Sequence, residues 1–112
     1  MLPVSLFAQV NDGIRQAMDN YDYETVVTLI EPDCQDSLLL ITKAQALKAM
    51  NRYPEAIGVL NSLILKDSTN TKVLIDLAEC YKLTGNSRRA ANCYQKAMNL
   101  QPENKFFRLQ FI

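Results

Sequence analysis

The sequence predicts an all-α protein, an α-solenoid of about three helix-turn-helix hairpins followed by the start of a further helix. Only three glycines and four prolines interrupt the 112 residues, which leaves long stretches without a helix breaker. Within those stretches apolar residues recur three and four positions apart, the spacing of one helix face. The segments 37–70 and 71–104 also match each other when the sequence is shifted by 34 residues. A fixed period of this kind indicates stacked repeats within one domain, residues 1–112.

Composition removes several classes of function. Hydrophobic residues make up 48% of the chain, too many for a disordered protein. Twelve basic and twelve acidic residues cancel, so no field attracts nucleic acid or an anionic membrane. Histidine, the commonest general base and metal ligand, is absent from the sequence. No apolar run reaches the ~18 residues of a membrane-spanning helix. We therefore expect no enzyme activity, no cofactor or metal, no nucleic acid partner and no membrane span.

The N-terminal sequence MLPVSLFAQ has two interpretations. An apolar run closed by Ala8 resembles the end of a secretory signal peptide cleaved before Gln9, of the kind common in exported proteins of Bacteroidetes-type bacteria. Because a basic start and a full apolar region are lacking, residues 1–8 would be the remnant of a longer precursor. In the other interpretation the apolar residues are the first turns of a packed helix. Localisation stays open, with the periplasm or cell envelope favoured over the cytoplasm.

Residues 3–36 predict a divergent first hairpin. The sequence YETVV at 23–27 is similar to YPEAI at 53–57, but the offset is 30 residues instead of 34. A shortened second helix ending at Ile30, before Glu31-Pro32-Asp33, accounts for the missing residues. Asp36 is placed to cap the helix that follows. The preceding helix has an apolar face at Val10, Ile14, Ala17 and Met18.

The segments 37–70 and 71–104 each predict two antiparallel helices of about 13 residues joined by a tight turn. In the later segment Gly85 suits the left-handed conformation that closes a helix, and Ser87 offers a hydroxyl to cap the next one. In the earlier segment Pro54 stands where a first helical turn tolerates proline. The apolar residues that coincide are Leu40 with Leu74, Ala44 with Ala78, Leu47 with Tyr81, Ala56 with Ala90, Leu60 with Tyr94 and Leu63 with Ala97.

The later segment resembles the tetratricopeptide repeat, whose signature is W-x2-L-G-x2-Y, then A-x3-F, then P. It keeps Leu77 and Tyr81, replaces the Trp with Leu74 and the Gly with Ala78, and continues with Ala90, Tyr94 and a final Pro102. The earlier segment departs further, with Lys43 at the Leu site, Leu47 at the Tyr site and Ser68 at the Pro site. The resemblance implies a right-handed superhelix of hairpins.

The same resemblance implies a binding face. In this family the first helices of successive hairpins line a concave groove that takes peptides or extended segments of partner proteins. Carried onto this sequence, the groove positions are Arg15, Thr42, Gln45, Lys48, Lys72, Asp76, Glu79 and Lys82, with Asn11, Asp12, Asp19 and Ile41 beside them. We therefore expect a protein–protein interaction scaffold, although these positions also suit a solvated helix face. The clamp that holds chaperone tails in some members is not expected, because Asp76 stands where that clamp needs Arg.

The C-terminal sequence resembles the first half of a further hairpin and suggests an alternative role. Residues 105–112 read KFFRLQFI, whereas the end of a solenoid normally carries a polar outer face. The alternative is a structural or oligomerising segment that stacks on another copy or on further repeats of a longer protein. The apolar residues that would mediate it are Phe106, Phe107, Leu109, Phe111 and Ile112.

Three cysteines lack the spacing of a metal site. Cys34, Cys80 and Cys93 are an odd number, so they cannot all pair within the chain. We expect buried free thiols. A bond between Cys80 and Cys93 stays open if the protein is exported, because those two residues lie on the two helices of one hairpin.

Overall fold

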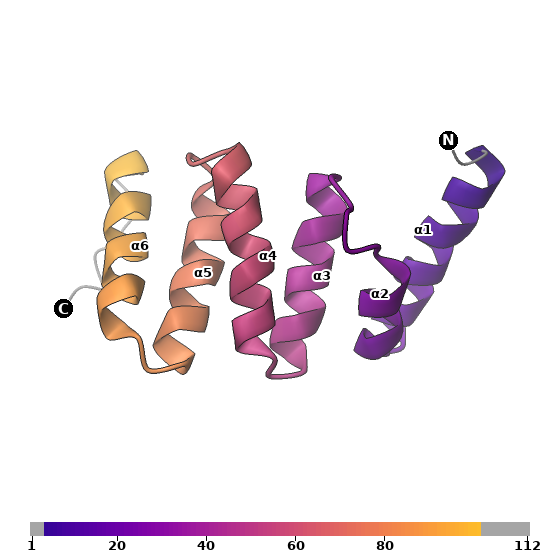
Figure 1. Ribbon diagram of the computed structural model, residues 1–112, viewed down its shortest axis with the longest axis horizontal. Helices are drawn as coiled ribbons and strands as arrows, with labels where there is room; N and C mark the ends of the chain where they lie inside the picture. Colours follow the sequence, from indigo (N-terminus) through magenta and orange to yellow (C-terminus); the bar gives the residue numbers. More distant parts are fainter. Residues whose placement is uncertain (1–3, 102–112) are drawn as a thin grey trace.

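The described part of the chain is entirely helical. A computed structural model describes residues 4–101, and it describes side chains from residue 11 onward. These residues form six helices, α1 Val4–Asp19, α2 Tyr23–Leu29, α3 Ser37–Ala49, α4 Tyr53–Lys66, α5 Thr71–Leu83 and α6 Ser87–Leu100. They pair as three antiparallel hairpins placed side by side (Figure 1), which confirms the predicted fold class. The expected further helix and its five apolar residues lie outside the described residues.

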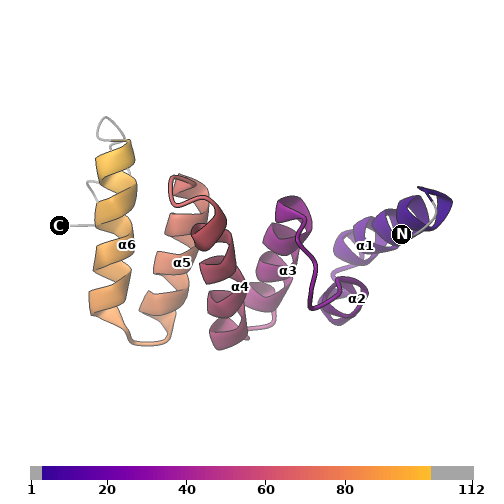
Figure 2. The ribbon, with the colours of Figure 1, turned by 45° about the horizontal axis from the view of Figure 1, so that its top comes forward.

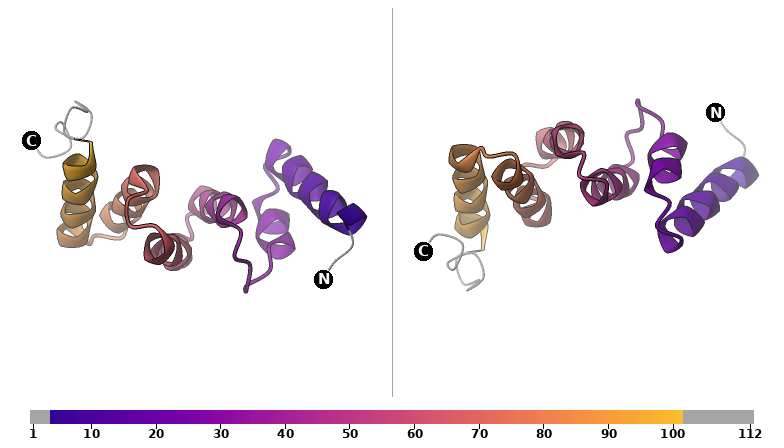
Figure 3. Two further views of the ribbon diagram at one scale, coloured as in Figure 1. Left: turned by 90° about the horizontal axis from the view of Figure 1, so that it is seen from above. Right: turned by 90° about the horizontal axis from the view of Figure 1, so that it is seen from below.

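The hairpins form an elongated stack. The Cα radius of gyration is 15.4 Å, against about 13 Å for a compact domain of this length. Seen from above, α1, α3 and α5 lie toward one side of the stack, and α2 and α4 lie toward the other (Figure 3). The middle hairpin is set back from the two end hairpins in this view, so the surface formed by α1, α3 and α5 is the inner side of a shallow arc. We call this surface the inner face.

All three hairpin turns have the same geometry. Two positions past the end of the first helix, φ is positive, at 57° for Tyr21, 59° for Asn51 and 82° for Gly85. The following amide donates to the carbonyl five positions back at 2.8 Å in every turn. This pattern is the Schellman motif, in which a left-handed residue ends the helix. The sequence predicts it at Gly85. Its presence at Tyr21 was not expected, because residues with a Cβ rarely adopt this conformation.

Helix starts follow the predicted chemistry with one correction. Asp36 caps α3, since its carboxylate accepts hydrogen bonds from the amides of Leu38 and Leu39 at 2.9 and 3.2 Å. The prediction that Ser87 caps α6 is wrong. Asn86 occupies the cap position, where its Oδ1 accepts from the amide of Arg89 at 3.2 Å. The asparagine precedes the serine by one residue and still has non-helical backbone angles, so its side chain reaches the amide that needs a partner.

Every apolar residue that coincides between the two repeats is buried. Small side chains at Ala44, Ala78 and Ala56 are at most 1% exposed, which lets neighbouring helices approach closely. Larger side chains fill the space between them, and Leu60 and Leu74 are at most 1% exposed. The other coinciding residues, all buried, are Leu40, Leu47, Leu63, Tyr81, Ala90, Tyr94 and Ala97. The coinciding positions therefore predicted a large part of the core of residues 37–101, which also contains Ala46, Val73, Leu77, Cys80 and Cys93.

The first hairpin departs from this pattern in two ways. Counted from the turn, Ile14 stands where the next hairpin has Ala44, and Ala17 stands where it has Leu47, so the order of small and large side chains is reversed. Helix α2 has 7 residues, whereas α4 has 14. Figure 2 shows α2 as a short coil beneath α1, followed by a long connection to α3. Helix α1 diverges from α3 (Figure 1).

Candidate functional site

The inner face carries the residues that the family resemblance assigned to a groove. Arg15, Lys72 and Lys82 are exposed, and the other five predicted positions are half-buried. The structure brings five of the eight into two groups. Arg15 and Thr42 line a hollow between α1 and α3. Lys48, Asp76 and Glu79 form an ion-pair cluster between α3 and α5. Gln45, Lys72 and Lys82 belong to neither group.

The α1–α3 hollow lies where α1 diverges from its neighbour. Its volume is about 410 Å³, and it is lined by polar and apolar side chains together. The apolar lining consists of Ile14, Met18, Leu38 and Leu39. Leu38 is 76% exposed, which makes it one of the most exposed large apolar side chains of the described residues. An apolar surface of this kind, rimmed by polar groups, is typical of an interaction site.

The polar groups of the hollow are partly occupied by local contacts. Arg15 contacts Asp12 at 3.2 Å, and both side chains are well exposed. Thr42 donates its hydroxyl hydrogen to the carbonyl of Leu38 at 2.9 Å. The carboxylate of Asp36 is used in capping α3. A ligand in this hollow would therefore meet mainly apolar surface, with exposed charges at the rim.

Leu38 and Leu39 were not among the predicted site residues. Their signal in the sequence is the run of three leucines at 38–40. Leu40 is buried and Leu39 packs half-buried against the core of the first hairpin, so Leu38 is the one leucine of the run that the core does not use. An apolar residue that does not lie on the core-facing side of its helix indicates a surface site, and the sequence already contained this signal.

Beside the α1–α3 hollow, the ion-pair cluster of Lys48, Asp76 and Glu79 links α3 to α5. The Nζ atom of Lys48 lies 3.0 Å from Oε2 of Glu79 and 3.3 Å from Oδ1 of Asp76. Burial acts to lower the pKa of Lys48, but the hydrogen bond to Glu79 and the charges of both carboxylates together raise it. Three of the predicted groove residues are therefore bound to one another and join successive hairpins.

The cysteines are free in this structure, as expected. Burial raises the pKa of Cys80, and it raises that of Cys93 as well. Both thiols are therefore poor nucleophiles near neutral pH. Within the described residues, no group of three Cys, Asp or Glu side chains is arranged to hold a metal ion. The same residues contain no helix long and apolar enough to cross a membrane.

Comparisons with known proteins agree with this architecture. The chain is 35% identical over 86 residues to a Dictyostelium discoideum protein described as DnaJ homolog subfamily C member 7 homolog. That match covers 75% of this chain but only 16% of the Dictyostelium protein, so the chain spans a small part of its relative.

Two solved structures have a similar fold. The Yersinia enterocolitica type III secretion chaperone SycD, in complex with a peptide of the translocator YopD, gives a TM-score of 0.76 at 20% identity, covering 96% of this chain and 88% of SycD. The second is PcrH from Pseudomonas aeruginosa, in complex with the chaperone binding region of PopB. Its TM-score is 0.74 at 15% identity, and the match covers 92% of this chain and 86% of PcrH. At these identities the likeness concerns the fold.

Family membership rests on a direct match to a family description. The tetratricopeptide repeat model matches residues 47–110, which is more than half of the chain. The matched region contains the whole of the best-formed hairpin, α5 with α6, and most of the hairpin before it. The chain belongs to the tetratricopeptide repeat family, and its architecture is that of a protein-interaction scaffold.

Proposed function

We propose that the chain binds an extended peptide of a partner protein on its inner face, with the α1–α3 hollow as the principal contact. The observation that carries this proposal is the hollow itself, where the exposed Leu38 and the half-buried Leu39 lie beside Arg15 and Thr42. Burying an exposed leucine contributes about 1.5–3 kcal/mol, which makes Leu38 a strong anchor for an apolar side chain.

The rest of the inner face would contribute in a different way. Lys48, Asp76 and Glu79 are already paired with one another, and the two carboxylates leave this cluster with one net negative charge. Lys72 and Lys82 are exposed on α5 and can contact polar groups of the ligand. Because the helices are already formed, little conformational entropy is lost when the peptide binds.

The structural relatives support a peptide as ligand. SycD was crystallised with a peptide of the translocator YopD, and PcrH with the chaperone binding region of PopB. Their fold spans nearly the whole of this chain, including the divergent first hairpin. The identity of the partner does not transfer from them, because at 20% and 15% identity most side chains that would contact a peptide differ between the proteins.

The test uses two exposed leucines as a matched pair. Peptides are selected from a random displayed library on the intact protein, and their affinities are measured by calorimetry. Leu38→Ser should weaken a selected peptide about tenfold or more, since one buried apolar side chain is lost. Leu65→Ser is the control, because Leu65 is 89% exposed on α4 and lines neither the hollow nor the inner face. Equal effects of the two substitutions on every selected peptide would refute the proposal.

Self-association through residues 106–112 stays a second proposal. Those residues lie outside the described part of the chain. The exposed residues of α6 include the polar Asn92, Gln95, Lys96 and Asn99 and, at the end of the helix, Leu100, which is 44% exposed. Light scattering at high concentration tests the proposal, because a monomer for both the native chain and Phe107→Ser would contradict it.

A further inference from the structure

A second hollow lies on the other side of the stack, where α2 is short. It is bounded by α3, by α4 and by the connection 30–36, and its volume is about 380 Å³. Helix α2 stops at Leu29, about two turns short of the length of α4, and an irregular segment replaces those turns. We call this feature the α4 hollow. None of its lining residues lines the α1–α3 hollow.

The floor of the α4 hollow is apolar. Leu40 and Leu47 lie beneath it and are 7% and 1% exposed, and Val59 is half-buried beside them. Gly58 lines the hollow, and a Cβ built on it would meet no other heavy atom within 4 Å. The space above Gly58 is therefore open.

The rim of the α4 hollow is positively charged. Lys43 and Lys66 both line it. The Nζ atom of Lys66 donates a hydrogen bond to the carbonyl oxygen of Gln35 at 2.6 Å, which leaves its charge without a carboxylate. Among the described residues, no carboxylate oxygen lies within ion-pair distance of either lysine. Both lysines thus line the hollow without a carboxylate in ion-pair contact.

The one acidic residue that lines the hollow is already bound. Both oxygens of Glu55 accept hydrogen bonds from Arg52, at 2.8 Å from Nε and 2.6 Å from Nη2. The hydrogen bond from Arg52 is the main cause that lowers the pKa of Glu55, and the charge of Lys43 makes a smaller contribution. Because the guanidinium binds this carboxylate in a two-point contact, Glu55 offsets the charge of the lysines only in part. Glu31 and Asp33 belong to the adjoining connection but do not line the hollow.

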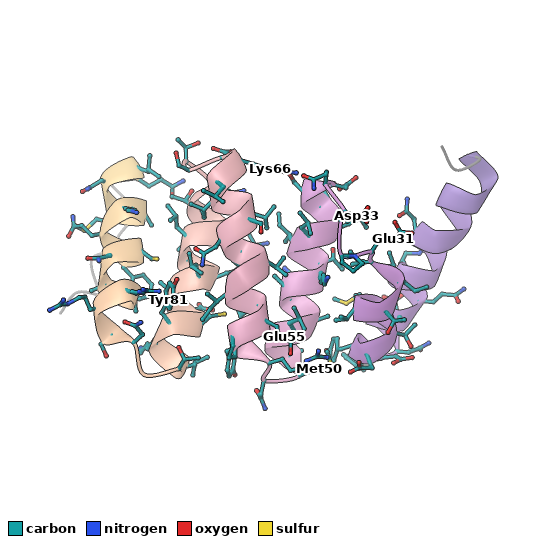
Figure 4. The ribbon with its side chains drawn as sticks, in the orientation of Figure 1. Glu31, Asp33, Met50, Glu55, Lys66 and Tyr81 are labelled. Carbon is teal, nitrogen blue, oxygen red and sulfur yellow. The ribbon has the colours of Figure 1, made fainter. Side chains whose placement is uncertain are left out.

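The lining residues on α4 extend along most of that helix. They run from Glu55 near its start to Lys66 at its end, and Figure 4 shows these two side chains at opposite ends of α4. The separation is about 16 Å at the helical rise of 1.5 Å per residue. An extended peptide covers that length with about five residues. A small carboxylic acid would occupy only a fraction of it.

We infer that the α4 hollow binds an acidic–aliphatic peptide segment of a partner protein, with its carboxylates on Lys43 and Lys66 and its aliphatic side chains over Leu47 and Val59. This site is independent of the inner face, since the two surfaces share no lining residue. One partner can therefore be held on both sides of the second hairpin.

The probe is a capped six-residue peptide of alternating glutamate and leucine, titrated into the ¹⁵N-labelled protein and followed by NMR. We expect the amide signals of Lys43, Gly58 and Ser62 to shift, and the matching lysine–leucine peptide to leave them unchanged. The double variant Lys43→Glu/Lys66→Glu should weaken binding about tenfold, the effect of two partly exposed ion pairs. Lys96→Glu, on the exposed side of α6, should leave the affinity unchanged. Equal binding of the two peptides would overturn the inference.

A filling substitution separates this site from the inner face. Gly58→Phe should remove the shifts caused by the glutamate–leucine peptide, because the ring occupies open space. Gly58→Ala keeps the hollow open and should retain them. Leu38→Ser should not change the titration, so failure of the inner-face proposal leaves this result intact. Retained binding by Gly58→Phe would refute the site. The same shifts with sodium butyrate at equal concentration would refute a peptide as its occupant.

Discussion

The Lys48 cluster permits a quantitative test of how successive hairpins are joined. Lys48→Met keeps the apolar part of the side chain but removes its charge, which leaves the carboxylates of Asp76 and Glu79 side by side on α5. Lys48 and Asp76 are 22% and 17% exposed, and Glu79 is 43% exposed, so the cluster lies between a surface and a buried ion pair. Two contacts of about 0.5–1 kcal/mol each predict a loss of about 1–2 kcal/mol in the free energy of unfolding.

Urea unfolding followed by circular dichroism measures this loss. Lys82→Met is the control, since Lys82 is exposed on α5, the helix that carries Asp76 and Glu79. It should change the free energy of unfolding by less than about 0.5 kcal/mol. A double-mutant cycle with Asp76→Asn should return a coupling of about 0.5–1 kcal/mol. A loss no larger than that of the control, together with zero coupling, would refute the idea that this cluster stabilises the stack.

The pH dependence gives a second check on the same residue. The folded pKa of Lys48 is raised above 10.5, because its two carboxylate partners outweigh the effect of burial. Its contribution is therefore complete below pH 10.5 and is lost as the pH rises through the folded pKa. The stability difference between the native chain and Lys48→Met should stay constant from about pH 7 to 10 and shrink above that range. A difference that grows at alkaline pH would contradict this assignment.

Three further predictions concern the core, the caps and the thiols. Leu60→Ala should lower the free energy of unfolding by about 2–5 kcal/mol in urea titrations, because the fully buried side chain leaves a cavity. Asn86→Ala should cost about 1 kcal/mol by the same method, whereas Ser87→Ala should be nearly neutral, since the asparagine makes the capping hydrogen bond. Cys80 and Cys93 should react with a thiol reagent only in denaturant, because burial raises the pKa of both thiols.

Each of these three has an outcome that would contradict it. A Leu60→Ala loss below about 0.5 kcal/mol would mean that the middle hairpin is not the core of the stack. Equal effects of the two cap substitutions would show that the serine hydroxyl is used after all. Rapid labelling of the native chain at more than one thiol would show that the last hairpin opens readily, since Cys34 is the half-buried cysteine and the other two are buried.

Local patterns were sufficient for most of the fold. The alanine pairs and their large neighbours placed the core of the second and third hairpins, because helical periodicity decides which face of a segment is apolar. Asp36 and Gly85 also predicted a cap and a turn that the structure confirms. The exceptions arose where two residues compete for one position, as Asn86 and Ser87 do, or where tertiary packing imposes an unfavourable conformation, as at Tyr21.

The candidate sites depended on relations between distant residues. The resemblance to the family placed Lys48, Asp76 and Glu79 on one face, but it did not show that they bind one another. Lys48 is 28 and 31 positions from its two partners, and the distance between them depends on how α3 and α5 each pack against α4. Leu38 and Leu39 were missed because the repeat pattern assigned only Leu40 of their run, whereas the hollow beside them depends on where α1 lies.

The sequence by itself determined that the chain is a stack of helical hairpins and which side chains form its core, since both follow from the spacing of apolar residues along each helix. Only the tertiary structure decided where the stack is open. Reversed side-chain sizes at Ile14 and Ala17 accompany the divergence of α1, and the short α2 leaves α4 uncovered. Both hollows therefore depend on how helices lie against one another, a property that no single helix contains.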